Sequence, residues 1–247
     1  MSTRIRCPHH EEKTASCHLY LDHYYCFGCG ATGPLTNLDK SILPDVIEAV
    51  EPEDLAKSLA RIDKLPTKVI RGLEFPYDSQ GYYLVWPDRD YYKLRMFDSN
   101  AEAKYIGARG HKRPLLWAQK NQSTNLLLVE GEINALSLAK ALDGIDIASP
   151  GGAGDFSSRR IRKLLTSIGN YSTVVVIADR DRAGTEAIIN AVSELRSSGR
   201  EALGILMEED ANALLERVGA LGLKQHVLGK IERAVEAGSK DRSLPGR

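Results

Sequence analysis

The stretch that decides the fold is residues 174–181, Val-Val-Val-Ile-Ala-Asp-Arg-Asp. A continuous apolar run that ends in acids is typical of a strand buried on both faces of a parallel sheet. The chain around it repeats this alternation, with apolar runs at residues 126–129, 145–148 and 202–206 and helical spacing at residues 133–142, 157–168, 183–195 and 210–218. We therefore expect an α/β domain over residues 123–218, with a parallel sheet built from right-handed crossovers.

Acidic residues follow three of these strands. Glu130 follows the first strand, Asp179 and Asp181 follow the third, and Asp210 follows the fourth. The carboxyl ends of parallel strands meet at one edge, where open sheets bind their ligands. Because Mg²⁺ or Mn²⁺ prefers hard oxygen ligands, the sequence predicts a catalytic metal site formed by these four residues. The plainer alternative, helix capping, explains a single acid better than four that share an edge.

All four cysteines lie within the first thirty residues. Cys7-Pro8-His9-His10 and Cys26-Phe27-Gly28-Cys29 are separated by fifteen residues, and each turn can present two ligands to a tetrahedral zinc ion. We expect a structural zinc site at Cys7, His10, Cys26 and Cys29, with two short strands between the turns that reverse near Asp22. From spacing alone, His9 could replace His10, and Cys17 could replace either histidine.

The middle of the chain carries its positive charge. Residues 81–86 and 91–97 read as a hairpin, in which Lys93 and Arg95 share one face because side chains alternate along a strand. From residue 93 to residue 120 there are seven basic residues against two acidic ones, an excess of five. We expect this segment to bind template and nucleotide phosphates through Lys93, Arg95, Lys104, Lys112 and Arg113.

Bulk composition sets the remaining limits. The 247 residues include 33 basic and 33 acidic side chains, so the formal net charge is zero, which is unusual for a nucleic-acid binder unless its charge is segregated. With 43% apolar residues the chain can form a packed core. We see no apolar run of about 18 residues and no signal sequence, and expect a cytoplasmic protein without membrane contact.

Five segments follow from these patterns: a zinc-binding ribbon at 1–36, a linker at 37–66, a strand-rich basic subdomain at 67–122, the α/β domain at 123–218 and a C-terminal tail at 219–247. The linker should contain helices that begin near Pro44 and Glu53, and the tail should be loose from Ser239 onward.

The N-terminal stretch CPHHEEKTASCHLYLDHYYCFGCGATG resembles the zinc-binding domain of bacterial replicative primases and phage primase–helicases. The resemblance implies that His10 rather than His9 is the ligand and that Cys17 packs in a small core. It also implies that the ribbon helps to recognise the start site on the template.

The stretches LLLVEGEINALSLAKA, SPGGAG, VVVIADRDRAG and EEDANALL resemble the Toprim domain of primases, and YKLR and PLLW match the layout of phage primases. In that family the metal-binding acids fall on Glu130, Asp179 and Asp181, with a further acid on Asp210. The resemblance implies a DNA primase that makes short oligoribonucleotides from ribonucleoside triphosphates on single-stranded DNA. A replicative helicase on a separate chain is then an expected partner, and the host cytoplasm the location of a phage-encoded protein. The alternatives are a Toprim nuclease and a non-catalytic zinc-ribbon accessory protein.

Overall fold

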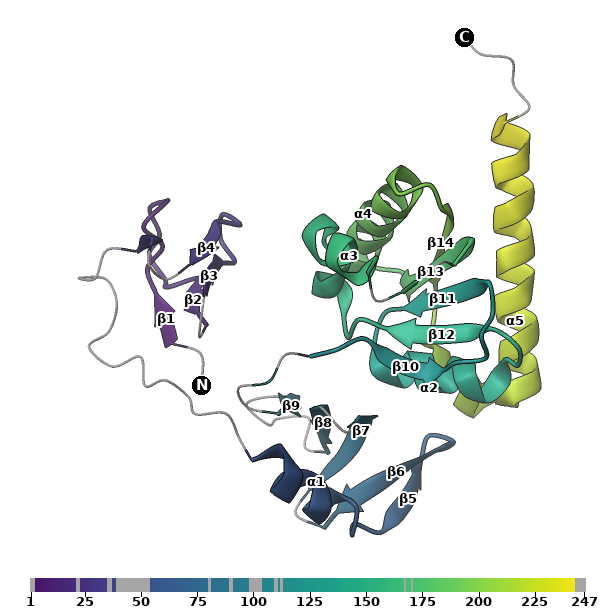
Figure 1. The fold of residues 1–247 in the computed structure, drawn as a ribbon, viewed down its shortest axis with the longest axis horizontal. Coiled ribbons are helices and arrows are strands. Elements are labelled where there is room, and N and C mark those ends of the chain that lie inside the picture. The colour runs from purple at the N-terminus through teal and green to yellow at the C-terminus, as the bar shows by residue number, and fades with distance from the viewer. Residues whose placement is uncertain are drawn as a thin grey trace. The chain divides into compact units, whose positions relative to one another are not determined.

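The computed structural model describes the residues in the following ranges: 3–20, 23–34, 37–38, 54–79, 81–88, 91–97, 104–108, 111, 113–166, 168–169 and 171–242. Two compact units make up the chain (Figure 1): Met1–Asp54 with Ala108–His111, and Leu55–Gly107 with Lys112–Arg247.

The N-terminal unit contains a four-stranded antiparallel sheet, which we call the ribbon sheet. Its strands follow chain order: β1 (Thr3–Ile5), β2 (Cys17–Leu19), β3 (His23–Cys26) and β4 (Thr32–Pro34). The expected strand pair is confirmed as β2 and β3, while Asp22, where we placed the reversal, lies outside the described residues. The core is small, as in other domains that rely on a metal, and includes Cys17, Leu19 and Tyr24.

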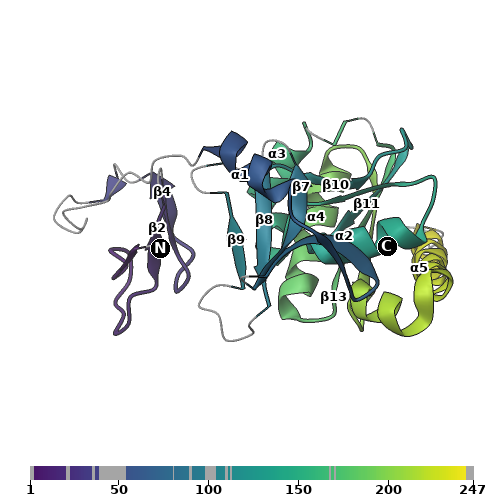
Figure 2. The same cartoon turned by 90° about the horizontal axis from the view of Figure 1, so that it is seen from below.

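The larger unit begins with helix α1 (Leu55–Ile62), close to the helix that we expected from Glu53. The helix expected near Pro44 lies outside the described residues. An antiparallel sheet follows, in chain order: β5 (Thr67–Ile70), β6 (Leu73–Asp78), β7 (Tyr82–Asp88), β8 (Tyr91–Met96) and β9 (Tyr105–Gly107). The predicted hairpin is confirmed as β7 and β8, which lie side by side with β9 in Figure 2.

A second, mixed sheet carries the predicted α/β domain. Its strands are β10 (Leu116–Gln119), β11 (Asn125–Val129), β12 (Asp146–Ser149), β13 (Thr173–Asp179) and β14 (Glu201–Met207), in the order β10-β12-β11-β13-β14. The four predicted strands are parallel to one another, as expected. We did not predict β10, which pairs antiparallel with β12 at the edge of the sheet.

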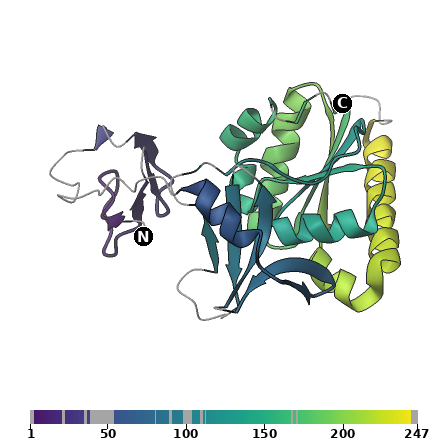
Figure 3. The same cartoon turned by 60° about the horizontal axis from the view of Figure 1, so that its bottom comes forward.

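Helices cover both faces of the mixed sheet (Figure 3). They are α2 (Glu132–Ala141), the short 3-10 helix η2 (Ala153–Phe156), α3 (Ser158–Leu164), α4 (Arg182–Ser197) and α5 (Ala211–Arg242). Strand β11 shows why two layers form: Leu127 and Val129 pack in the core that includes α2 and α5, while Leu126 and Leu128 pack in the core with α3 and α4. Because successive side chains of a strand point to opposite faces of the sheet, an entirely apolar strand contributes to the cores on both faces.

The C-terminal helix runs further than the sequence suggested. Helix α5 bends at Gly219, whose φ of 72° lies in the left-handed region, and then continues to Arg242. The end that we expected to be loose from Ser239 is therefore helical as far as Arg242. Leu223 and Val227 are fully buried, so packing on the sheet stabilises the part of α5 after the bend. No helix among the described residues is both long and apolar enough to span a bilayer.

Candidate functional site

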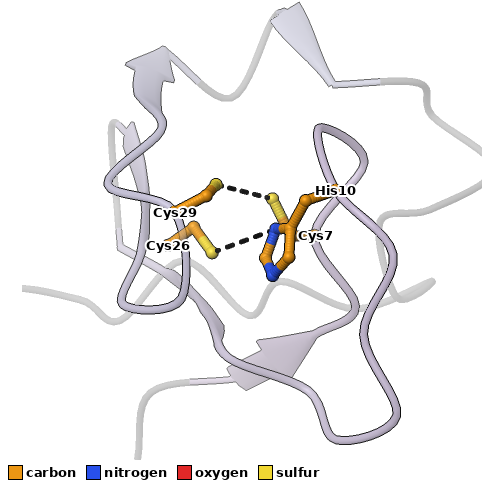
Figure 4. Close-up of side chains that lie close together, drawn as sticks. All are labelled: Cys7, His10, Cys26 and Cys29. Carbon is orange, nitrogen blue, oxygen red and sulfur yellow. Dashed lines mark hydrogen bonds between the residues drawn. The ribbon is translucent and has the colours of Figure 1, made fainter.

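The four expected zinc ligands lie together at the ends of the ribbon strands (Figure 4). The ligand atoms of Cys7, His10, Cys26 and Cys29 are all within 4.8 Å of one another. The Cys7 and Cys29 sulfurs are 3.6 Å apart, and the Cys26 sulfur lies 3.8 Å from His10 Nδ1. Three sulfurs and one imidazole nitrogen are a standard donor set for tetrahedral zinc, so the cluster supports a structural zinc ion.

The two alternative ligands lie outside this cluster. His9 Nε2 is 2.7 Å from the Tyr24 hydroxyl, and the two rings stack. Cys17 is fully buried and lies opposite Cys26 in the β2–β3 register. Although burial raises the pKa of Cys26, hydrogen bonds from Ser16 and from backbone amides lower it overall. A thiol with a lowered pKa is readily deprotonated to the thiolate that binds zinc.

Glu12 orients the histidine, a role that sequence reasoning missed. Its carboxylate accepts hydrogen bonds from the amides of Cys7 (2.7 Å) and Ser16 (3.0 Å) and from the Ser16 hydroxyl. The bonds to Ser16 are the main reason why the pKa of Glu12 falls to about 2. Glu12 Oε2 also lies 3.2 Å from His10 Nε2, which leaves Nδ1 facing Cys26. In metal sites, a hydrogen bond from the second ring nitrogen to a carboxylate commonly fixes the orientation of the ligating imidazole.

At the carboxyl edge of the mixed sheet, three of the four predicted acids come together. The Glu130 amide donates to the Ile177 carbonyl (2.8 Å), and the Asp179 amide donates to Glu130 Oε2 (3.4 Å). Glu130, Asp179 and Asp210 line one cavity of about 190 Å³, together with Glu132. Strands β11, β13 and β14 thus bring residues separated by eighty positions to one place.

The negative charges of these carboxylates act on one another. Burial, and then the charge of Asp179, raise the pKa of Glu130. Burial, followed by the charges of Asp210 and Asp181, raises the pKa of Asp179. Half-buried acids that repel one another are typical of a site that a cation completes.

Two of the four acids also cap helices, as the plainer alternative allowed. Asp181 Oδ1 accepts from the Gly184 amide at the start of α4, and Asp210 Oδ1 accepts from the Ala213 amide at the start of α5, each at 2.7 Å. Each cap engages one oxygen of its carboxylate. Asp181 does not line the cavity, and within the described residues the zinc cluster is the only compact set of three or more potential ligands. The carboxylates are therefore spread more widely than the zinc ligands.

Of the predicted cations that the structure describes, two line the cavity and two form ion pairs. Arg95 and Lys104 line the cavity beside Tyr105, to which Arg95 donates a 3.2 Å hydrogen bond. Lys93 shares the face of Arg95, since both lie over the Tyr105 ring, but it is buried and forms an ion pair with Glu132.

Of the two remaining predicted phosphate ligands, the structure describes Arg113, which does not line the cavity. The guanidinium of Arg113 forms an ion pair with Asp155. Lys112 lies outside the described residues.

Arg71 is a cavity cation that the sequence did not reveal. It occupies the tip of the β5–β6 hairpin with a φ of 48°, which is rare for any residue but glycine. The amide nitrogen of Asn212, a side chain only 4% exposed, donates to the Arg71 carbonyl and to Ser137 Oγ, each at 3.1 Å. In the sequence, Asp210-Ala211-Asn212 was the only indication that Asn212 belongs to the site. The sequence did not indicate that Asn212 anchors a hairpin 141 positions away.

Comparison with known proteins agrees with this arrangement. Residues 3–61, which include the zinc cluster, match the CHC2 zinc finger family, and residues 125–220, which include the four acids, match the Toprim domain family. No curated protein matches the chain at a significant level.

Two similar solved structures are primases. The primase fragment of the bacteriophage T7 primase–helicase protein aligns over 94% of this chain and 100% of its own, with a TM-score of 0.50 and 15% identity. The zinc-binding and RNA polymerase domains of the Aquifex aeolicus primase align over 92% of this chain and 78% of their own, with a TM-score of 0.48 and 16% identity. The likeness to the T7 fragment indicates a shared fold. With both family domains in one chain, this protein belongs to the DNA primases that join a CHC2 zinc finger to a Toprim domain.

Proposed function

We propose that this primase joins ribonucleotides at the carboxyl edge of the mixed sheet, in the cavity bordered by Glu130, Asp179 and Asp210. The observation that carries the proposal is the composition of this cavity, in which the three predicted acids and Glu132 share the lining with three cations, Arg71, Arg95 and Lys104. Acids can hold divalent ions and cations can hold phosphates, and nucleotidyl transfer needs both.

The acids fit Mg²⁺ or Mn²⁺. Their oxygens are hard ligands, and Mg²⁺ keeps several waters, so carboxylates need not enclose it as the cysteines enclose zinc. Glu130 and Asp179 would hold the metal from the cavity wall, while Asp181 and Asp210 would use the oxygens that their helix caps leave available. When bound, divalent ions activate the attacking 3′-hydroxyl and stabilise the departing pyrophosphate.

The cations would bind the nucleotide and template phosphates. Arg95 and Lys104 keep the role that we predicted, and Arg71 joins them from the hairpin tip. Arg95 is oriented by its hydrogen bond to Tyr105, which reduces the entropy that it loses on binding a phosphate. For Lys112 the same role stays a prediction. Buried Lys93 would act through Glu132 rather than by contact with phosphate.

Segment 1–36 would read the single-stranded DNA template. Three aromatic side chains of this segment are exposed: Tyr25 in β3, Tyr20 directly after β2, and Phe27 directly after β3, which is 63% exposed. Exposed aromatic side chains on a sheet can stack with unpaired bases. We assign nucleotide binding to segment 67–122 and metal binding to segment 123–218. A replicative helicase partner on a separate chain and a cytoplasmic location stay predictions.

The test is templated incorporation of radiolabelled ribonucleotides on single-stranded DNA by the Asp179→Asn and Asp181→Asn variants. We expect primer synthesis to fall at least about 100-fold in both, with folding retained. Asp143→Asn, which changes an exposed carboxylate outside the cavity, is the matched control and should be unaffected. Undiminished synthesis by Asp179→Asn would exclude this site. Cleavage of the DNA by the unmodified protein and Mg²⁺ without nucleotides would favour a nuclease instead.

A further inference from the structure

Backbone amides from two different elements act on the Glu130 carboxylate. One is the amide of Asp179, 3.4 Å from Oε2. The other is the amide of Ala153, whose interaction with the carboxylate offsets part of the rise that burial causes in the pKa of Glu130. Ala153 begins the short helix η2, and the preceding Gly152 lines the same cavity as Glu130. The loop between β12 and η2 therefore forms part of the cavity wall beside Glu130.

This loop is held by buried Phe156 in η2 and by side-chain charges rather than by strand pairing. Asp155, in η2, forms an ion pair with the Arg113 guanidinium. Arg160, in α3, places its Nε 3.6 Å from Asp155 Oδ1 and donates a 3.1 Å hydrogen bond to the Arg113 carbonyl. Asp155 thus lies between two guanidinium groups, one from the segment before β10 and one from α3. We call Arg113, Asp155 and Arg160 the charge clamp.

The clamp is partly buried and closely fitted to the loop. The side chains of Arg113 and Asp155 are 27% and 18% exposed, so their attraction is screened less than in a surface pair. Gly151, at a φ of 115°, leaves room for the guanidinium, because a Cβ at this position would lie 2.7 Å from Arg113 Cζ. The guanidinium of Arg113 packs on the backbone of Gly151 and pairs with Asp155. To bind a phosphate it would have to give up these contacts with the loop.

We propose that the charge clamp positions the Ala153 amide, and through it the Glu130 carboxylate, for nucleotidyl transfer. Arg113 is then a positioning residue and not the phosphate ligand that its sequence context suggested. The inference rests on the proposed function insofar as Glu130 is a residue of the reaction site.

The experiment compares Arg113→Ala, Asp155→Ala and the double variant in the full chain. Partners that orient metal-binding carboxylates usually contribute about 10–100-fold to activity, so kcat for primer synthesis should fall by that factor in each single variant. The double variant should be no worse than either single variant, because both remove one interaction. Template affinity should not change. Arg113→Lys, which keeps the charge but not the fork, should recover part of the kcat.

Hydrogen exchange supplies a readout that is independent of turnover. The Ala153 amide should exchange faster in Arg113→Ala and in Asp155→Ala than in the unmodified protein. Arg162→Ala is the matched control, because it breaks a comparable arginine–carboxylate pair (2.6 Å, to Glu194) away from the loop. Both kcat and Ala153 exchange should be unchanged in this control. Asp155→Asn provides a milder variant should Asp155→Ala unfold.

Two results would refute the proposed role of the charge clamp. In the first, Arg113→Ala weakens template binding and lowers the slope of its salt dependence by about one, while Asp155→Ala has no effect, as expected of a phosphate contact. In the second, Asp155→Ala and Asp155→Asn keep normal kcat and normal Ala153 exchange although Glu130→Gln abolishes synthesis. By contrast, full activity of Glu130→Gln would refute the proposed function itself, whatever the clamp variants show.

Discussion

Replacing Gly184 with alanine should displace the metal-binding acids without removing any of them. Gly184 is buried in the first turn of α4, and its amide caps the helix by donating to Asp181 Oδ1 (2.7 Å). A Cβ at this position would lie 2.0 Å from the Asp179 carbonyl oxygen and 3.1 Å from its carbonyl carbon. The helix approaches the end of β13 this closely only because residue 184 has no side chain.

The size of the effect follows from these distances. Cβ atoms essentially never come within 3.0 Å of another heavy atom, so α4 and Asp179 must separate by at least 1.0 Å, the difference between 3.0 and 2.0 Å. The obstacle is backbone and cannot rotate away. Overpacking of this kind costs about 1–3 kcal/mol, and each kcal/mol lowers Tm by about 2–4 °C in a chain of this size. A 1 Å displacement of catalytic groups reduces kcat by about 100-fold.

The assay is templated ribonucleotide incorporation, with Tm measured in parallel. Gly229→Ala is the matched control, because it makes the same substitution in α5, where the nearest atom is Arg233 Nη1 at 3.4 Å, the mobile end of a side chain. Alanine is the better helix former, so the control should gain about 0.5–1 kcal/mol and keep its kcat. Unchanged kcat and Tm in Gly184→Ala would refute the reasoning.

Three further predictions concern other parts of the site. Glu132→Gln should lower the free energy of unfolding by about 3–5 kcal/mol in urea titrations, because it leaves buried Lys93 unpaired, whereas the double change with Lys93→Met should recover most of the loss. Glu12→Gln should weaken zinc binding about 10–100-fold in chelator competition, because His10 loses the carboxylate that orients it; unchanged affinity would contradict this role. Arg71→Gly keeps a residue that tolerates the positive φ but removes the guanidinium, so the KM for nucleotides should rise about tenfold with Tm retained, and an unchanged KM would exclude contact with phosphate.

The parallel strands and the acids could be predicted because their signals are local. An apolar run buried on both faces, such as residues 126–129, shows its nature without reference to its partners, and an acid directly after such a strand must lie at the sheet edge. Strand β10 could not be predicted in this way. It is four residues long, and it is a strand only because β12 offers an unpaired edge to Leu116 and Trp117.

The chain itself determined the order of the zinc-binding and α/β segments, the two turns that supply the zinc ligands, and the sheet edge at which the acids gather, because turns, strand alternation and spacing act between neighbours in sequence. Because spacing alone left both histidines open, the choice of His10 over His9 needed the structure. Tertiary structure alone decided what each cation does. Lys93 and Arg95 have the same local pattern, yet Glu132 pairs with one and the cavity receives the other. Arg71 reaches the acids from a hairpin tip. Ion pairs depend on distances between segments far apart in the chain, and no local pattern contains those distances.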